Sequence, residues 1–156
     1  MTMEFQVIGK GGKYTVQDKT GRLIYSIKKK GFGSRYNLMD ASNYNLYTLV
    51  QTGDAKRPFF TIILNDNVFM SMECTSLFLN PTIKAKNKTM RFEITSKDRK
   101  NFDIILNDAK VGNIQSLLGV NGEMQYHFDV ENKAFDDYIS LFAVAIDRAF
   151  GEMNKS

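Results

Sequence analysis

The sequence predicts a mainly β protein of the α+β type: a closed antiparallel β-barrel of about twelve strands around a C-terminal hydrophobic α-helix. Two observations predict the strands, since apolar and polar residues alternate along most of the chain and turn residues interrupt this alternation at short intervals. A third observation predicts the helix, because the segment YISLFAVAIDRAF at 138–150 is apolar on nearly every side. With 156 residues and 43% hydrophobic content, the chain is expected to form a single domain over 1–156.

Two early segments have the pattern of β-hairpins. The first reads YTVQ, DKTG and RLIYSIKK, where Asp18 suits an early turn position and Gly21 can adopt the positive φ that restarts a strand. The second reads YNLMD, ASNY and NLYTLV, with Asp40 opening the turn. Each segment therefore predicts two antiparallel strands.

A seven-residue pattern, F-x-I-I-L-N-D, occurs twice, at 60–66 and 102–108. In both copies an apolar strand runs into Asn-Asp and a second strand follows. Asn and Asp bond to their own backbone and tolerate left-handed geometry, so both pairs are suited to hairpin corners. Duplication and independent selection of the same turn chemistry explain the repeat equally well, and both predict hairpins.

The full pass along the chain predicts twelve strands. They lie near residues 4–8, 14–17, 23–29, 34–39, 46–51, 58–64, 67–73, 82–86, 89–95, 101–106, 110–117 and 124–130. In the last of these, alternate residues from Met124 to Val130 share an apolar face, so His127 is expected on the exposed face. Aromatic side chains in the apolar phase of their strands are expected in the core; they are Tyr14, Tyr25, Tyr36, Tyr47 and Phe92.

Capping signals predict a C-terminal helix from about Lys133 to Phe150. Asn132 can cap its start, Asp136 and Asp137 suit the positive end of the helix dipole, and Gly151 suits the position after its end. Because the apolar residues surround the axis, this helix needs apolar surroundings on most sides. A bilayer, a multilayer core and a barrel interior would each supply them.

Charged residues on both sides of the apolar run argue against a membrane span, which takes about 20 predominantly apolar residues. A closed sheet of about twelve strands, in contrast, has an interior larger than its own side chains can fill. The helix is therefore predicted to lie inside the barrel.

The chain resembles the tubby C-terminal domain superfamily, and in particular the LURP-one-related family. The resemblance rests on YTVQDKTGRLIYSI, on the second hairpin with MDAS, and on the closing helix with an Asp near its end, FAVAID. The segment NVFMSMECTSLFLNP and the lysine-rich stretch after it match no motif of that family. The resemblance implies a twelve-stranded barrel threaded by a helix. For function it points to lipid surfaces: tubby proteins bind phosphoinositide head groups through basic surface residues, and the related phospholipid scramblases act at membranes.

Two basic clusters are the candidate ligand-binding residues. Residues 1–100 carry 17 Lys and Arg against 8 Asp and Glu, whereas residues 101–156 carry 4 against 9. The first cluster is Lys28, Lys29, Lys30 and Arg35; the second is Lys84, Lys86, Lys88 and Arg91. Cations beside a glycine-containing turn can hold a phosphate. Lysines also solubilise surfaces and protect sheet edges, and this second interpretation stays open for both clusters.

No catalytic signature is present in the sequence. Cys74 and His127 are the only residues of their kinds, and nothing in the spacing of metal-ligating residues predicts a metal site. The segments GKGG at 9–12 and GFGS at 31–34 lack the strand-to-helix context of nucleotide-binding loops and are expected to be turns. We therefore expect no enzyme and no cofactor, and we expect Cys74 in the core.

The function predicted from the sequence is docking on anionic phospholipid or phosphoinositide head groups through basic surface patches. The alternative is an intracellular scaffold or regulatory protein that binds another polypeptide, and nucleic-acid binding ranks third. With one cysteine and no secretory signal pattern at the N-terminus, we expect a cytoplasmic protein, with peripheral attachment at the inner membrane surface if the lipid hypothesis holds. The oligomeric state is left open.

Overall fold

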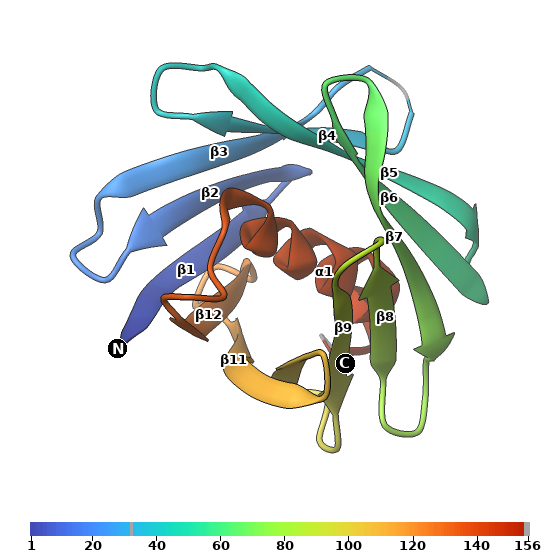
Figure 1. Ribbon diagram of the computed structural model, residues 1–156. Helices are drawn as coiled ribbons and strands as arrows, with labels where there is room; N and C mark the ends of the chain where they lie inside the picture. The colour runs from blue at the N-terminus through green and yellow to red at the C-terminus, as the bar shows by residue number, and fades with distance from the viewer. Residues whose placement is uncertain (32, 155–156) are drawn as a thin grey trace.

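Twelve antiparallel strands close into a barrel around a C-terminal helix (Figure 1). The structure is a computed structural model that describes residues 1–31 and 33–154, with the side chains of 152–154 left aside. Each strand pairs with its neighbours in the sequence, and the barrel closes where β1 pairs with β12. The strands are β1 (Thr2–Lys10), β2 (Lys13–Asp18), β3 (Leu23–Lys29), β4 (Arg35–Asp40), β5 (Asn45–Asp54), β6 (Arg57–Leu64), β7 (Asn67–Ser76), β8 (Thr82–Lys86), β9 (Arg91–Ser96), β10 (Asn101–Leu106), β11 (Ala109–Leu118) and β12 (Met124–Glu131). The predicted fold class and the twelve predicted strands are confirmed.

The turn chemistry read from the sequence forms the expected hairpins. Asp18 Oδ1 accepts hydrogen bonds from the backbone of Thr20 and Arg22, and Gly21 has a φ of 88°. In both copies of the F-x-I-I-L-N-D pattern, Asn and Asp adopt positive φ, with values from 49° to 71°. Both copies also carry a register shift between their two isoleucines. The repeat therefore encodes the same bulged hairpin twice.

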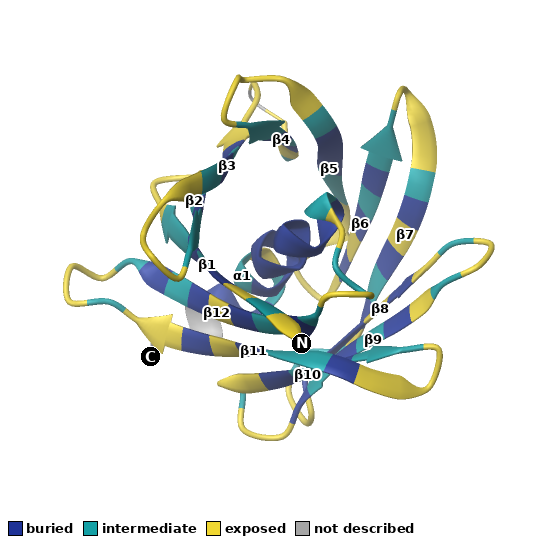
Figure 2. Ribbon diagram, turned by 60° about the vertical axis from the view of Figure 1, so that its left-hand side comes forward, coloured by how far each residue is buried: buried dark blue, intermediate teal, exposed yellow. Residues whose placement is uncertain are grey.

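Residues that face the inside of the barrel form one core with the helix (Figure 2). The aromatic residues predicted for the core, Tyr14, Tyr25, Tyr36, Tyr47 and Phe92, are all buried. The helix side chains from Leu141 to Ile146 are 0% exposed, so the apolar surface on every side of the helix is covered by the strands around it. The predicted placement of the helix inside the barrel is confirmed, and no helix in the described ranges is long and apolar enough to span a bilayer.

The predicted bounds of the helix, Lys133 to Phe150, are wrong at both ends. A 3₁₀-helix, η1 (Asp137–Ser140), comes first and leads into α1 (Leu141–Asn154). Asp136, with extended backbone at φ −147° and ψ 163°, caps η1 in place of the predicted Asn132, whose N–H donates to Met1 O. The hydrogen bonds of the preceding turn run back to Glu131, so the chain turns before it becomes helical.

Gly151 does not end the helix, because α1 continues to Asn154. Its role is steric: a Cβ at this position would lie 2.8 Å from Asp147 Oδ1, closer than real contacts allow. The glycine therefore makes room for the Asp147 carboxylate, which faces the same side of the helix one turn earlier.

The antiparallel order places the hairpin loops at two ends of the barrel. The loops of β1–β2, β3–β4, β5–β6, β7–β8, β9–β10 and β11–β12 form one end, which we call the basic rim. The remaining hairpins and the β12–η1 connection form the opposite rim. Within the barrel, η1 lies at the opposite rim, where Tyr25 Oη donates to Asp137, and Asp147 of α1 lies near the basic rim, where Tyr14 donates to it.

Candidate functional site

The first predicted cluster, Lys28, Lys29, Lys30 and Arg35, lies at the basic rim and is exposed. Lys28 faces Lys13 of β2 on one side and Asn37 of β4 on the other, so its nearest charged neighbour in the register is another cation. None of the four forms an ion pair with the side chains that the structure describes. The structure therefore brings these four predicted residues together on one exposed surface.

The basic rim carries further cations that the sequence analysis did not single out. They are Lys10 and Lys13 at β1–β2, Lys56 and Arg57 at β5–β6, Lys97, Arg99 and Lys100 at β9–β10, and Arg148 of α1. Apart from Arg148, these residues lie at alternate hairpins, far apart in the sequence. Only the strand order shows that they share one end of the barrel.

Carboxylates at the basic rim are occupied in capping their own loops. Asp54 Oδ1 accepts from the N–H groups of Lys56 and Arg57, both at 2.9 Å. Asp98 accepts from the backbone of Lys100 and Asn101, and these hydrogen bonds hold the pKa of its carboxyl well below its usual range. The acidic groups thus shape the loops, while the lysines around them are exposed.

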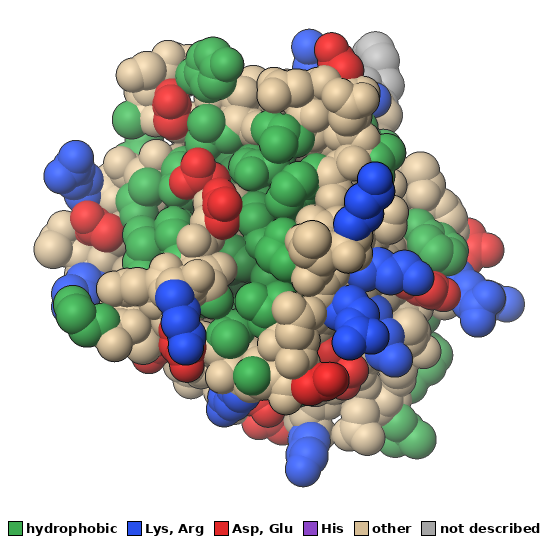
Figure 3. Space-filling model, in the orientation of Figure 1, with side chains coloured by type: hydrophobic (Ala, Val, Ile, Leu, Met, Phe, Trp, Pro, Cys, Tyr) green, Lys and Arg blue, Asp and Glu red, His purple; other side chains and the backbone are tan. Residues whose placement is uncertain are grey.

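The second predicted cluster, Lys84, Lys86, Lys88 and Arg91, is also exposed but lies on strands β8 and β9 and their hairpin at the opposite rim. Lys and Arg side chains gather over these two strands in Figure 3. Lys84 stands between Glu73 of β7 and Glu93 of β9 in the strand register. The structure therefore separates the two predicted clusters and gives the second one acidic neighbours.

A pocket of about 520 Å³ opens at the basic rim beside the last turns of α1. The glycine-containing β1–β2 hairpin forms one wall, and Tyr14, Tyr36, Asp147 and Arg148 are among the other lining residues. Gly9 is required here, because a Cβ would lie 2.6 Å from the Tyr14 ring. Lys10 and Arg148 also line this pocket, which we call the mouth pocket, and add two cations to it.

Asp147 joins the helix to two strands at the bottom of the mouth pocket. Its carboxylate accepts a hydrogen bond of 2.6 Å from Tyr14 Oη and one of 2.7 Å from Tyr126 Oη. Burial, with the nearby carboxylate, raises the pKa of both tyrosines far above the usual value, so the hydroxyls remain protonated donors. Next to it, Arg148 Nε donates to Gln51 Oε1 at 3.0 Å. This arrangement holds the helix in place.

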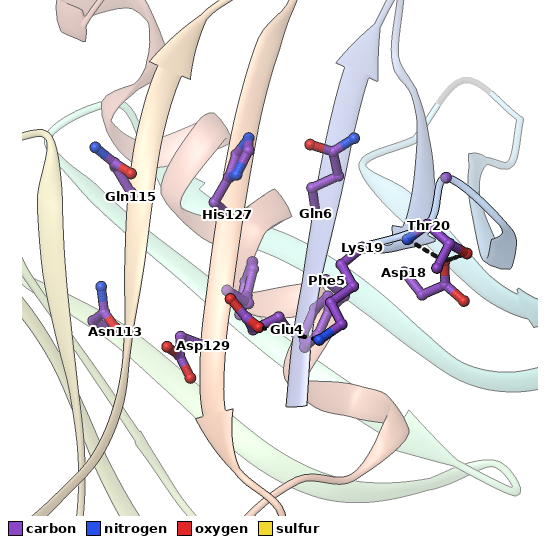
Figure 4. A pocket seen from close by; sticks show the side chains of 12 residues that line it. Glu4, Phe5, Gln6, Asp18, Lys19, Thr20, Asn113, Gln115, His127 and Asp129 are labelled. Carbon is purple, nitrogen blue, oxygen red and sulfur yellow. Dashed lines mark hydrogen bonds and ion pairs between the residues drawn. The ribbon is translucent and has the colours of Figure 1, made fainter. Parts of the chain in front are cut away.

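A second hollow, of about 590 Å³, lies on the outer face of β11, β12, β1 and the β2–β3 turn (Figure 4). Its side chains form two rows across the strands, Gln115–His127–Gln6 and Asn113–Asp129–Glu4. Glu4 pairs with Lys19 at 3.8 Å, and Asp129 Oδ1 is buried without a hydrogen-bond partner among the described residues. His127 is exposed as predicted, and its neighbours in the register are amides.

Cys74 and His127 do not meet, because Cys74 faces the core from β7 and His127 faces outward from β12. Burial raises the pKa of the Cys74 thiol to about 11, and its Sγ donates to Ser76 O at 3.5 Å. The predicted core position of Cys74 is confirmed. Within the described residues, no group of three metal-ligating side chains comes together.

Comparison with known proteins agrees with the barrel and its helix. The sequence pattern of the LURP-one-related family matches residues 2–147. A crystal structure of a protein from Arabidopsis thaliana superposes with a TM-score of 0.65 at 16% identity, covering 98% of this chain and 91% of that one. No curated protein matches the sequence. The fold is consistent with the tubby-like superfamily, and the chain belongs to the LURP-one-related family.

Proposed function

We propose that the protein is a non-enzymatic binding module that docks on anionic phospholipid head groups, phosphoinositides included, through the basic rim. The observation that carries this proposal is the gathering of Lys28, Lys29, Lys30 and Arg35 with cations from the other alternate hairpins at one end of the barrel. Their amines and guanidinium groups lie in solvent beside carboxylates that are engaged in loop turns. A planar anionic surface is complementary in charge to the basic rim.

The expected strength of this docking follows from the number of cations in reach. Each Lys or Arg near an anionic leaflet contributes about 1 kcal/mol, and the contribution falls off within a Debye length of about 10 Å at 0.1 M salt. Three or four such contacts give weak, reversible attachment. Arg35 adds bidentate contact with a phosphate, which lysine cannot make.

The mouth pocket supports the same proposal, since Lys10 and Arg148 lie where a head group would enter from the basic rim. This site requires neither a cofactor nor a metal ion. The proposed location is the cytoplasm, with peripheral attachment at the inner surface of the membrane.

The test is co-sedimentation with vesicles of phosphatidylcholine and a phosphoinositide at low ionic strength. We expect Lys28→Glu/Lys29→Glu/Lys30→Glu to abolish binding, because the reversal removes three attractions and adds three repulsions. The matched control is Lys84→Glu/Lys86→Glu/Lys88→Glu, which changes the net charge equally at the second predicted cluster. Both variants should keep the circular-dichroism spectrum of the wild type, since all six lysines are exposed. The control should melt somewhat lower, because Lys84→Glu lies between Glu73 and Glu93 in the strand register.

Binding that survives the first reversal and is lost with the second would move the site to Lys84, Lys86, Lys88 and Arg91. Equal loss in both variants would show that only net charge matters. A wild-type protein that ignores these vesicles at low ionic strength would contradict the lipid proposal and favour an acidic protein partner.

A further inference from the structure

The β7–β8 loop at the basic rim displays two large apolar side chains. Phe78 is 71% exposed and Leu79 is 85% exposed, although both lie in a turn between two well-paired strands. The loop projects at the lower right of Figure 1, where hydrophobic side chains stand out in Figure 3. The proposed function has not used this loop.

Side chains of the protein bind four consecutive backbone carbonyls of this loop. Arg99 Nη1 donates to Leu77 O at 3.0 Å and to Phe78 O at 2.9 Å. Ser76 Oγ donates to Leu79 O, and Thr82 Oγ1 donates to Asn80 O at 2.7 Å. The loop is therefore held in a defined shape with its two apolar side chains outward.

This pattern of hydrogen bonds suits entry into a membrane interface. A carbonyl that leaves water without a partner is costly, and hydrocarbon offers none. Because the carbonyls of residues 77–80 already have partners inside the protein, the tip can lose its water without leaving these acceptors unpaired. The fixed shape also reduces the conformational entropy that would be lost on insertion.

The loops on either side of the tip are basic. Lys56 lies in the β5–β6 loop with Arg57 at the start of β6, and Lys97 and Lys100 lie in the β9–β10 loop. All four are exposed. The next loop along the rim, β11–β12, carries a second apolar tip, where Leu118 is 55% exposed and Val120 is 100% exposed. Apolar tips thus alternate with cationic loops around this half of the rim.

We infer that the β7–β8 loop is a membrane wedge: Phe78 and Leu79 enter the boundary between head groups and acyl chains of an anionic bilayer while the flanking cations contact the head groups. The inference rests on the proposed docking and adds its orientation, with the basic rim facing the bilayer. A bilayer fits better than a protein partner, because the apolar surface is divided among narrow loop tips and surrounded by cations. A protein interface would instead present one continuous patch of about 800 Å².

A single tryptophan can report the insertion directly, because the chain contains none. Phe78→Trp places the probe at the wedge, and Tyr44→Trp places a control at the β4–β5 loop of the opposite rim, where Tyr44 is 67% exposed. With phosphatidylcholine/phosphatidylserine vesicles, we expect a blue shift and quenching by brominated acyl chains for Phe78→Trp. The emission of Tyr44→Trp should stay unchanged in the same preparation.

A second variant pair measures what the wedge contributes to affinity. Phe78→Ser/Leu79→Ser should weaken partition into the anionic vesicles by about tenfold to 100-fold, since two large apolar side chains lose their burial. The control is Tyr44→Ser/Val68→Ser, which removes two similarly exposed apolar side chains from the opposite rim. Its partition should equal that of the wild type.

The outcomes separate the wedge from the docking on which it rests. Salt-sensitive vesicle binding without quenching at Phe78→Trp would overturn the wedge and leave the proposed docking in place. Quenching at Tyr44→Trp in place of Phe78→Trp would reverse the orientation and also overturn it. Failure of the wild type to bind anionic vesicles would overturn both proposals.

Discussion

Replacing Asp147 by alanine should destabilise the protein by removing the acceptor shared by two buried tyrosines. Tyr126 is 0% exposed and Tyr14 is 3% exposed, and both hydroxyls donate to this carboxylate. The substitution leaves both donors without their partner. It also removes the polar connection between α1 and strands β2 and β12.

The magnitude follows from the surroundings of each hydroxyl. A buried donor that loses its partner costs about 1–3 kcal/mol, and hydrogen bonds to charged acceptors are at the upper end. Tyr14 lines the mouth pocket, where water can replace the carboxylate, whereas Tyr126 does not. We therefore expect a loss of about 3 kcal/mol, mostly from Tyr126. In a chain of this length, that loss lowers the melting temperature by about 6–12 °C.

Urea denaturation followed by circular dichroism measures the effect, and a double-mutant cycle assigns it. Tyr126→Phe removes the stranded hydroxyl, so Asp147→Ala/Tyr126→Phe should lose less stability than the sum of the single variants. Asp129→Ala is the control, because the buried Oδ1 of Asp129 has no partner among the described residues. A change below about 0.5 kcal/mol for Asp147→Ala, or strict additivity in the cycle, would refute this reasoning.

Three other predictions concern the core and the two residues that were candidates for chemistry. Val144→Asp should destabilise the protein by several kcal/mol in thermal melts, because it puts an unpaired charge at a 0% exposed position. Deletion of 134–156 should leave an insoluble or molten chain. A folded, monomeric truncated barrel in an NMR spectrum would contradict the prediction for the deletion. Native Cys74 should resist iodoacetamide at pH 8, because burial raises the pKa of its thiol to about 11. His127→Ala should leave vesicle binding and melting temperature unchanged. Rapid labelling of Cys74, or a loss of binding in His127→Ala, would contradict the expectation that neither residue has a chemical role. In urea melts, stability should fall between about pH 9 and 12. Desolvation raises the pKa values of Cys74 and Tyr47 in the folded state to about 11 and about 12, so the unfolded chain loses these protons first and the contribution of the two groups is lost over this range. A flat profile from about pH 9 to 12 would contradict the burial of both groups.

The fold was predictable because local and global signals agree in this chain. Alternation of apolar residues and Asp, Asn and Gly turns identified every strand, and both Asn-Asp turns have the left-handed backbone that their residues favour. The helix could be placed inside the barrel because its apolar residues surround the axis and a closed sheet of about twelve strands has room for it.

The helix ends were not predictable, because the deciding interactions are tertiary. Gly151 has the sequence signature of a helix end, but its missing side chain makes room for Asp147, whose position depends on Tyr14 and Tyr126 from distant strands. At the other end, Asp136 caps the 3₁₀-helix, after a turn that no capping pattern in the sequence indicates.

For the candidate site, the sequence identified the cations of two clusters and their exposure. It did not reveal that the first cluster shares a rim with Lys10, Lys56 and Lys100, because loops from alternate hairpins meet only once the barrel closes. The sequence also could not predict the shape of the β7–β8 loop, since the hydrogen bonds from Arg99 to its carbonyls join residues more than twenty positions apart.

The most direct measurement is the binding of the wild-type protein to vesicles as a function of salt. The account predicts binding to vesicles that contain phosphatidylserine or a phosphoinositide at low ionic strength, a steep decline as salt is added, and no binding to pure phosphatidylcholine. Absence of binding to the anionic vesicles at low ionic strength, or equal binding to the neutral ones, would contradict the claim that the basic rim docks on an anionic bilayer.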